Sequence, residues 1–252
     1  MTKTIFVAGA TGVIGSRLVP MLVSRGHRVV GMARSPEGSE PLLRAGALPA
    51  ICDVFDAPAL RKAIQAARPE VVVHQLTDLP RGLDPSRMEE GIRRNARMRK
   101  EGTANLVAAA LSAGVDHLVA QSIAWAYAPG NEPHTEESPL DAAADGPRAV
   151  TIGGVVALER AVLETPGLRG AVLRYGHIYG PGTGSSDAGV PLALHVDAAA
   201  WAAVLAVELG RTGLYNIVGP SSEVSSDKAR RELGWDAAAR SSSSTSDALL
   251  TM

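Results

Sequence analysis

The stretch Thr4-Ile-Phe-Val-Ala-Gly9-Ala-Thr-Gly12-Val-Ile-Gly15 decides the fold. An apolar run with strand character leads into three glycines, and a segment of helical period follows over residues 15–24. Gly9 permits a tight turn, Gly12 lets the backbone approach a pyrophosphate, and Gly15 allows the helix to pack closely on the strand. Free N–H groups and the positive end of the helix dipole would then face phosphates. The stretch therefore predicts a strand-turn-helix unit that binds a dinucleotide.

Strand-like apolar runs alternate with segments of helical period along the following residues, which is typical of a parallel sheet covered by helices on both faces. The expected strands are Thr4–Ala8, Arg28–Met32, Leu48–Cys52, Val71–Gln75, His117–Gln121 and Gly170–Arg174. The expected helices are Gly15–Ser24, Pro41–Ala45, Ala57–Ala67, Arg87–Ala113 and Val155–Glu164. Right-handed crossovers give an α/β fold with a Rossmann-type doubly wound parallel sheet.

The chain divides into three regions on this pattern. Residues 1–179 are expected to form a dinucleotide-binding Rossmann domain, and residues 180–239 a small, trimmed substrate-binding region. The elements expected in this second region are a buried Ala-rich helix, Val196–Leu209, a short strand, Leu214–Val218, and a last helix, Asp227–Leu233, which ends at Gly234. Residues 240–252 are Ser-rich and have little apolar surface to bury, so we expect a disordered tail.

Composition excludes several classes of function. The 252 residues are 46% hydrophobic and 20% charged with a formal net charge of −1, so nucleic acid and anionic membranes are not expected partners. The N-terminus has no basic leader and no apolar run is long enough to span a membrane, which favours a cytoplasmic protein. One cysteine, Cys52, and six scattered histidines give no metal site. A small-molecule substrate is the remaining kind of partner.

The end of the second strand indicates which dinucleotide is preferred. An NAD site places a carboxylate there to bind the ribose diol, whereas an NADP site supplies a cation for the 2′-phosphate. Here the sequence reads Gly31-Met-Ala33-Arg34-Ser35, with Ala33 where an acid would stand. We therefore predict NADP(H) in preference to NAD(H), with Arg34 as the phosphate ligand and Ser35 assisting; the alternative for Arg34 is a solvated loop arginine.

Several motifs resemble the short-chain dehydrogenase/reductase superfamily, especially its extended NAD-dependent epimerase/dehydratase-like members. They are the glycine spacing with Ala10-Thr11 inside it, Asp53-Val54 after the third strand, Glu101–Val107, Leu173–Gly182 and His195-Val196-Asp197. In that family the pair after the third strand meets the adenine. The resemblance and the expected strand ends together imply cofactor contacts from Gly9, Thr11, Gly12, Val13, Ile14, Gly15, Arg34, Ser35, Asp53, Val54, Gln75, Leu76, Thr77 and Gln121.

The proton-transfer residues of that family are missing. Its tyrosine acts as general acid and base, with a lysine four residues later on the same helix face. None of the four tyrosines has a lysine at that spacing, and a register anchored on Glu159-Arg160 puts Thr151 and Val155 at the two positions. The Ser/Thr that polarises the substrate maps to Ile123, and the relay asparagine maps to Arg99. The chain is thus expected to be an atypical member lacking the Tyr-x-x-x-Lys motif.

Three other residues could replace this apparatus. Tyr127 follows the fifth strand and is the best substitute acid, with a pKa expected near the reference value of about 10. Ser122 is one residue from the Ser/Thr position, and His177 follows the sixth strand, where its imidazole could act as acid or base. The alternatives are an aromatic that packs the loop for Tyr127 and a structural histidine for His177.

A basic run, Arg93 to Lys100, is flanked by glutamates. It is expected to be a solvated helix face or a homodimer surface, because relatives often pair through the fourth and fifth helices. For Arg99 the alternative is that it faces an anionic substrate.

Three functions remain open. The leading one is an NADP(H)-binding oxidoreductase or epimerase that acts on a small metabolite or a nucleotide-sugar-like substrate with a non-standard proton donor. The second is a redox-silent dinucleotide-binding sensor or scaffold, and the third is a non-redox lyase or cyclase on the same fold.

Overall fold

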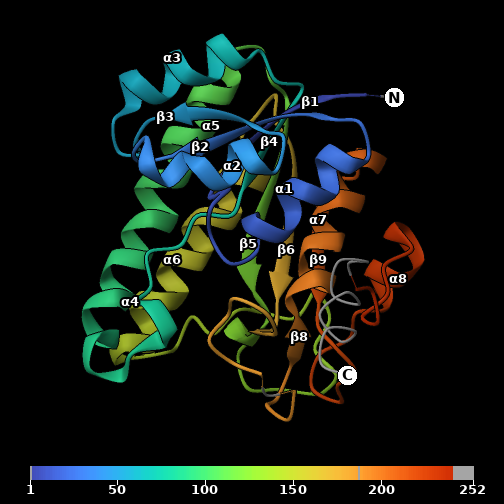
Figure 1. The fold of residues 1–252 in the computed structure, drawn as a ribbon. Helices are drawn as coiled ribbons and strands as arrows, with labels where there is room; N and C mark the ends of the chain where they lie inside the picture. The colour runs from blue at the N-terminus through green and yellow to red at the C-terminus, as the bar shows by residue number, and fades with distance from the viewer. Residues whose placement is uncertain (1, 187, 241–252) are drawn as a thin grey trace, which may run out of the picture.

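A seven-stranded parallel sheet forms the centre of the protein (Figure 1). The computed structural model describes residues 2–186 and 188–240. In order across the sheet, the strands are β3 (Leu48–Ile51), β2 (Arg28–Ala33), β1 (Thr4–Ala8), β4 (Val71–His74), β5 (His117–Ile123), β6 (Arg169–Tyr175) and β9 (Gly213–Ile217). All neighbouring strands pair in parallel, so the predicted doubly wound Rossmann-type sheet is confirmed. The tail predicted over residues 240–252 lies outside the described residues from residue 241 onward.

Helices cover both faces of the sheet because successive side chains of each strand point to opposite sides. In β1, Ile5 and Val7 join the core under α1 and α7, whereas Phe6 and Ala8 join the core under α3 and α5. The α-helices are α1 (Gly15–Ser24), α2 (Glu40–Arg44), α3 (Ala57–Ala67), α4 (Met88–Arg97), α5 (Thr103–Ser112), α6 (Gly146–Leu163), α7 (Val196–Leu209) and α8 (Asp227–Leu233). Single 3₁₀ turns lie at Glu37–Ser39, Arg81–Leu83, Pro85–Arg87 and Ala124–Ala126.

The segment expected as one helix over Arg87–Ala113 consists of three parts. A π-helical segment, Met98–Gly102, separates α4 from α5. Gly102 packs so closely there that a Cβ would lie 2.9 Å from Met98 Sδ. Hydrophobic periodicity does not distinguish a π turn from an α turn, and such turns are frequent at functional sites.

Helix α6 begins at Gly146, well before the expected start at Val155. Pro147 occupies the first turn, where its missing N–H costs nothing. The small residues Gly153 and Gly154 interrupt the apolar pattern of the helix, which is why the sequence indicated only its second half.

The region after residue 180 adds to the same sheet. Strand β9 pairs with β6, and α7 packs against α1. A short parallel pair, β7 (His177–Tyr179) and β8 (Ala193–His195), lies outside the main sheet. Trp235, after α8, is buried and donates from Nε1 to the carbonyl of Ala198 at 2.9 Å, which fixes the end of the described chain on α7.

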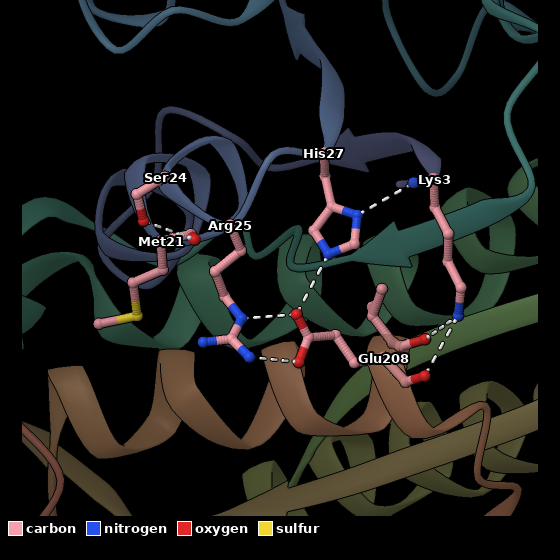
Figure 2. A network of polar contacts seen from close by, with 7 residues as sticks. Lys3, Met21, Ser24, Arg25, His27 and Glu208 are labelled. Atoms are coloured by element: carbon pink, nitrogen blue, oxygen red, sulfur yellow. Dashed lines mark hydrogen bonds and ion pairs between the residues drawn. The ribbon is translucent and has the colours of Figure 1, made fainter. Parts of the chain in front are cut away.

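A polar network ties the end of α7 to the first two strands (Figure 2). Glu208 accepts hydrogen bonds from Arg25 Nε and Nη2 at 2.5 and 2.7 Å. His27 Nδ1 accepts from the backbone N–H of Lys3, so Nε2 carries the proton and donates to Glu208 Oε1 at 3.2 Å. Lys3 Nζ donates to the carbonyl of Val207 at 2.6 Å, where a cation also complements the helix dipole. One carboxylate therefore joins α7 to the turn between α1 and β2.

Replacement of Glu208 by Gln is expected to lower the free energy of unfolding by about 1 kcal/mol, or the Tm by about 2–4 °C. Hydrogen bonds from Arg25 hold the pKa of the Glu208 carboxyl below its usual range. Its stabilisation is therefore present above the unfolded pKa of about 4.3 and is lost as the pH falls through the folded value.

Thermal unfolding of both proteins at neutral pH and in acid measures this effect. The control is Glu164→Gln, because Glu164 is 70% exposed and reaches Arg160 only at 4.0 Å. A difference between wild type and Glu208→Gln that is the same in acid as at neutral pH would contradict the assignment.

Candidate active site

The turn between β1 and α1 is shaped by two glycines that tolerate no side chain. Gly9 has a φ of +84°, and a Cβ there would lie 2.5 Å from the carbonyl carbon of Gln75. A Cβ on Gly15 would lie 2.1 Å from the carbonyl oxygen of Gly9. The turn is thus pressed against the end of β4 on one side and against α1 on the other.

The outer side of this turn is open. Thr11, Gly12 and Val13 are exposed, whereas Ile14 is buried in the core beneath them. Gly12 closes the turn by donating its N–H to the carbonyl of Gly9 at 3.0 Å. These residues stand at the N-terminal end of α1, where the helix dipole favours an anion.

The residues expected to contact the adenosine lie after β2 and β3. Arg34 is exposed and makes no hydrogen bond or ion pair within the described ranges, and Ser35 Oγ accepts from the N–H of Gly38 at 3.2 Å. Asp53 Oδ1 accepts from the backbone N–H of Phe55 at 2.8 Å. Val54 is buried, and its carbonyl accepts from Asn105 Nδ2 at 2.9 Å.

The ends of β4 and β5 meet beside Gly9. Gln121 Nε2 donates to the carbonyl of Leu76 at 3.3 Å, and Thr77 follows as an exposed residue. Gln75 is buried and its Nε2 lies 3.4 Å from the hydroxyl of Tyr175, while its Oε1 is sealed from solvent with no partner among the described residues. The structure therefore brings these predicted cofactor residues to one edge of the sheet.

Ser122 and Tyr127 belong to one buried polar cluster, which also contains Glu159, Arg174 and Asn216. Ser122 Oγ donates to Glu159 Oε1 at 2.8 Å, and Arg174 binds both oxygens of that carboxylate at 2.8 and 2.6 Å. The Tyr127 hydroxyl donates to Asn216 Oδ1 at 2.6 Å, and the Arg174 guanidinium lies 4.9 Å from the centre of its ring. Burial raises the pKa of the Tyr127 phenol above its ordinary value, rather than leaving it unchanged as expected.

His177, the third predicted catalytic residue, lies outside this cluster. It is exposed on one side and stacks on Trp125 with the ring centres 4.4 Å apart. Loss of solvent on the stacked side lowers the pKa of its imidazole. The three predicted catalytic residues are thus not brought together around one point.

An apolar patch includes two of the four positions where the family resemblance places the proton-transfer residues. Ile123 and Val155 pack together with Ala126 and Ile152, and we call these four residues the apolar patch. Thr151, at the tyrosine position, donates its hydroxyl to the carbonyl of Pro147 within its own helix at 3.2 Å. None of these side chains carries a group that ionises near neutral pH.

One lysine does lie over a tyrosine, at the opposite edge of the sheet. Lys228 Nζ is 4.9 Å from the ring centre of Tyr215. The Tyr215 hydroxyl is hydrogen-bonded to the carbonyl of Thr212 and to Glu232. Burial and Glu232 raise the pKa of this phenol to about 12, so the pair is not an activated acid or base.

The basic run on α4 pairs with glutamates one helical turn away. Arg93, Arg94 and Arg97 bind Glu89, Glu90 and Glu101 at a spacing of four residues. Such exposed pairs are typical of a solvated face. The homodimer expected through this helix stays a prediction. Arg99, by contrast, is buried in the π-helical segment.

Two features of the site were missed from the sequence. Glu159 was not predicted to belong to the site, although a glutamate on a largely apolar helix opposite a strand arginine signals a buried pair. A hollow of about 580 Å³ also lies in the predicted substrate region, lined by Tyr179, Gly180, Pro181, Gly184, Ser185, Ser186 and His195.

In the part of the chain that the structure describes, no group of three His, Cys, Asp or Glu side chains could hold a metal ion. No helix in that part is long and apolar enough to cross a membrane.

Gly12→Ala is expected to weaken binding of NADP⁺ by about tenfold or more, because a methyl group on the exposed Gly12 would stand where the backbone is expected to approach the pyrophosphate. The new Cβ would also lie 3.2 Å from the carbonyl oxygen of Gly9. Equilibrium titration with NADP⁺ measures the effect. Gly130→Ala is the control, since a Cβ there meets only ordinary contacts at 3.7 Å or more. Equal affinity in Gly12→Ala and wild type would place the pyrophosphate elsewhere.

Comparison with known proteins identifies the family. The sequence profile of the NAD dependent epimerase/dehydratase family matches residues 5–217. A 3-diazoavenalumate denitrifying reductase from Streptomyces sp is 44% identical over 234 residues, which cover 84% of this chain and 75% of the relative.

Solved structures share the fold at low identity. DesIV, a dTDP-glucose 4,6-dehydratase from Streptomyces venezuelae solved as a double mutant with NAD and DAU bound, is 20% identical with a TM-score of 0.75, covering 92% of this chain and 91% of that one. WbmG from Bordetella bronchiseptica, solved with NAD and UDP, is 20% identical with a TM-score of 0.73, covering 96% and 91%. The profile match, the relative and the shared architecture establish that the chain belongs to the NAD dependent epimerase/dehydratase family.

Proposed function

We propose that the protein is an NADP(H)-dependent reductase that replaces the diazo group of a small carboxylate substrate with hydrogen. The relative from Streptomyces supports the reaction class, since its name describes a reductase that acts on a diazo carboxylate. The observation that carries the proposal is the apolar patch, whose Ile123 and Val155 stand at two of the four positions that the family resemblance gives to proton-transfer residues.

The cofactor site fits a nicotinamide dinucleotide. The glycine turn and the N-terminal end of α1 would hold the pyrophosphate, and a side chain at Gly12 would crowd that approach. Asp53 and Val54 would contact the adenine, and Gln75, Leu76, Thr77 and Gln121 would line the nicotinamide side. When bound in its reduced form, the cofactor supplies a hydride.

The same site supports a preference for NADP(H). Ala33 removes the carboxylate that would repel a 2′-phosphate, and Arg34 stands exposed beside it with no partner in the described residues. The nearby Ser35 hydroxyl adds a polar group that can bind the same phosphate. An arginine fork suits a phosphate better than it suits a ribose diol.

The apolar patch restricts the chemistry of the substrate. Epimerisation and carbonyl reduction both move a proton at a hydroxyl oxygen, and both profit from a positioned acid or base. Replacement of an arenediazonium group by hydride forms one C–H bond and breaks one C–N bond. The electron pair of the broken bond leaves with dinitrogen, so atoms and charges balance without a proton from the protein. A site without a tyrosine–lysine pair is therefore sufficient for this reaction.

Tyr127 and Ser122 then serve mainly to position the exit of β5. Their hydroxyls are engaged by Asn216 and Glu159 inside the buried polar cluster. In a reaction that takes a proton from the protein, Tyr127 is the residue predicted to donate it. Such a reaction differs from a proton-free one in whether the product carries deuterium from the solvent.

Incubation of the protein with 4-carboxybenzenediazonium and NADPH is expected to give benzoate, dinitrogen and NADP⁺. With NADPH deuterated at the transferred position, the deuterium is expected on the ring carbon; in D₂O with unlabelled NADPH, the product carries none. Tyr127→Phe is expected to retain the activity within about threefold, because its hydroxyl moves no proton.

Mass spectrometry of the product and absorbance of NADPH provide the two readouts. Solvent deuterium in the product, or loss of activity in Tyr127→Phe with NADP⁺ binding intact, would contradict a proton-free reaction. Conversion of UDP-glucose to its epimer under the same conditions would favour the family's sugar chemistry instead.

Arg34→Ala is expected to weaken NADP⁺ binding by about tenfold or more and to leave NAD⁺ binding within about twofold. Separate titrations with NADP⁺ and NAD⁺ measure this change, and Arg44→Ala, which removes an exposed arginine paired only with Glu40, is the matched control. Similar affinities of wild type for the two dinucleotides would remove the preference from the proposal.

A further inference from the structure

Arg99 is a buried cation without a partner among the described residues. Its side chain lies in the π-helical segment and the residue is 7% exposed. No hydrogen bond from its guanidinium reaches any described residue, and no described carboxylate oxygen comes within 4.0 Å of it. Buried charges in proteins are normally paired, because an unpaired charge loses its hydration without compensation.

The guanidinium of Arg99 is not completely sealed from solvent. The sealed side-chain atoms without partners among the described residues are Gln75 Oε1, His117 Nε2, Arg174 Nη1 and Asn216 Nδ2. The nitrogens of Arg99 are not sealed in this way, so the small exposed fraction of the residue includes its donors. A molecule that entered the site could therefore reach them.

The groups around Arg99 do not neutralise it. The carboxylate of Glu159 acts on Arg99 electrostatically, but its two oxygens already bind Arg174. Burial and the charge of Arg99 lower the pKa of His74 to about 4, so this imidazole is neutral at pH 7. Burial lowers the pKa of Arg99 itself only to about 10, which leaves the guanidinium charged. The two arginines and one glutamate leave one positive charge in excess.

The surroundings of Arg99 place it beside the apolar patch. A Cβ on Gly154 would lie 3.4 Å from Arg99 Cδ, so the side chain crosses α6 at the residue that precedes Val155 of the patch. Its electrostatic coupling to His74 places it near the carboxyl end of β4. The cation therefore lies at the sheet edge that carries the predicted cofactor residues.

We infer that Arg99 binds the carboxylate of the substrate, and that the apolar patch packs against the rest of the substrate molecule. This inference rests on the proposed function for the identity of the anion. A cofactor phosphate has the same charge chemistry, and separate titrations distinguish the two sources. A planar carboxylate matches the two-pronged donor geometry of arginine, which lysine cannot reproduce.

Binding of benzoate in the presence of saturating NADP⁺ tests the inference without any turnover. Wild type is expected to bind benzoate at least about tenfold more tightly than its neutral analogue benzamide. Arg99→Met is expected to lose this discrimination and to bind NADP⁺ as wild type does. Lys100→Met is the matched control, because it removes an exposed cation from the same turn and should leave both affinities unchanged.

Thermal unfolding supplies a second readout. Arg99→Met should keep or raise the Tm of the free protein, because it removes an uncompensated buried charge, and benzoate should raise the Tm of wild type only. Arg99→Lys keeps the charge and loses the two-pronged contact, so it should bind benzoate several-fold more weakly; it carries the test if Arg99→Met does not fold.

Benzoate binding that is undetectable in wild type, or unchanged in both Arg99 variants, would overturn the inference. A loss of NADP⁺ affinity instead of benzoate affinity would assign Arg99 to a cofactor phosphate. Because these measurements use no diazo compound, an Arg99-dependent benzoate site would survive failure of the proposed reaction, and the reaction would survive failure of this site.

Discussion

The close contact between Gly9 and the backbone of Gln75 is the constraint on which the arrangement at the carboxyl edge of the sheet depends. No side chain fits there, and the φ of +84° suits only glycine. This contact places the open glycine turn beside the ends of β4 and β5. The N-terminal end of α1, the end of β2 and the buried polar cluster then lie along one edge of a single sheet. In open α/β sheets this carboxyl edge is where ligands bind.

The polar and apolar parts of that edge are clearly separated. The buried polar cluster satisfies most of its hydrogen bonds internally, through a carboxylate that Arg174 and Ser122 share. The apolar patch next to it offers no acid or base. Arg99 differs from both, because its charge is buried and has no counterpart in the described residues. We interpret this arrangement as a site that orients a carboxylate and excludes water, while the reacting group needs no proton from the protein.

The fold was largely predictable because the strands are short apolar runs in the sequence and the first helix directly follows the glycine-rich turn after β1. Strand β1 and helices α1, α3, α7 and α8 have the predicted bounds. The first half of α6 was not predicted, because glycines interrupt its apolar pattern. The π turn Met98–Gly102 was not predicted either, because its hydrophobic periodicity does not differ from that of an α-helix. The strand β7 is three residues long, too short for a pattern to show.

The candidate site was predictable only in part. The sequence indicated the cofactor residues through local motifs, and the absence of a tyrosine–lysine pair followed from spacing alone. The partners of Ser122 and Tyr127 were not predictable, because they are far away in sequence. Glu159 reaches Ser122 only through the packing of α6 on the sheet, and Asn216 reaches Tyr127 only through the pairing of β9 with β6. For the same reason, the isolation of Arg99 could be recognised only after its neighbours were paired with other groups.

We propose that the protein transfers a hydride without moving a proton. This proposal is tested most directly by the solvent isotope effect on a single turnover of 4-carboxybenzenediazonium with enzyme-bound NADPH, measured by rapid mixing in H₂O and D₂O. If no proton moves, the ratio of rate constants in the two solvents is expected to be about 1, together with a clear slowing when the transferred hydrogen of NADPH is deuterium. A solvent ratio of about 2 or more, abolished in Tyr127→Phe, would contradict the proposal and assign proton donation to that residue.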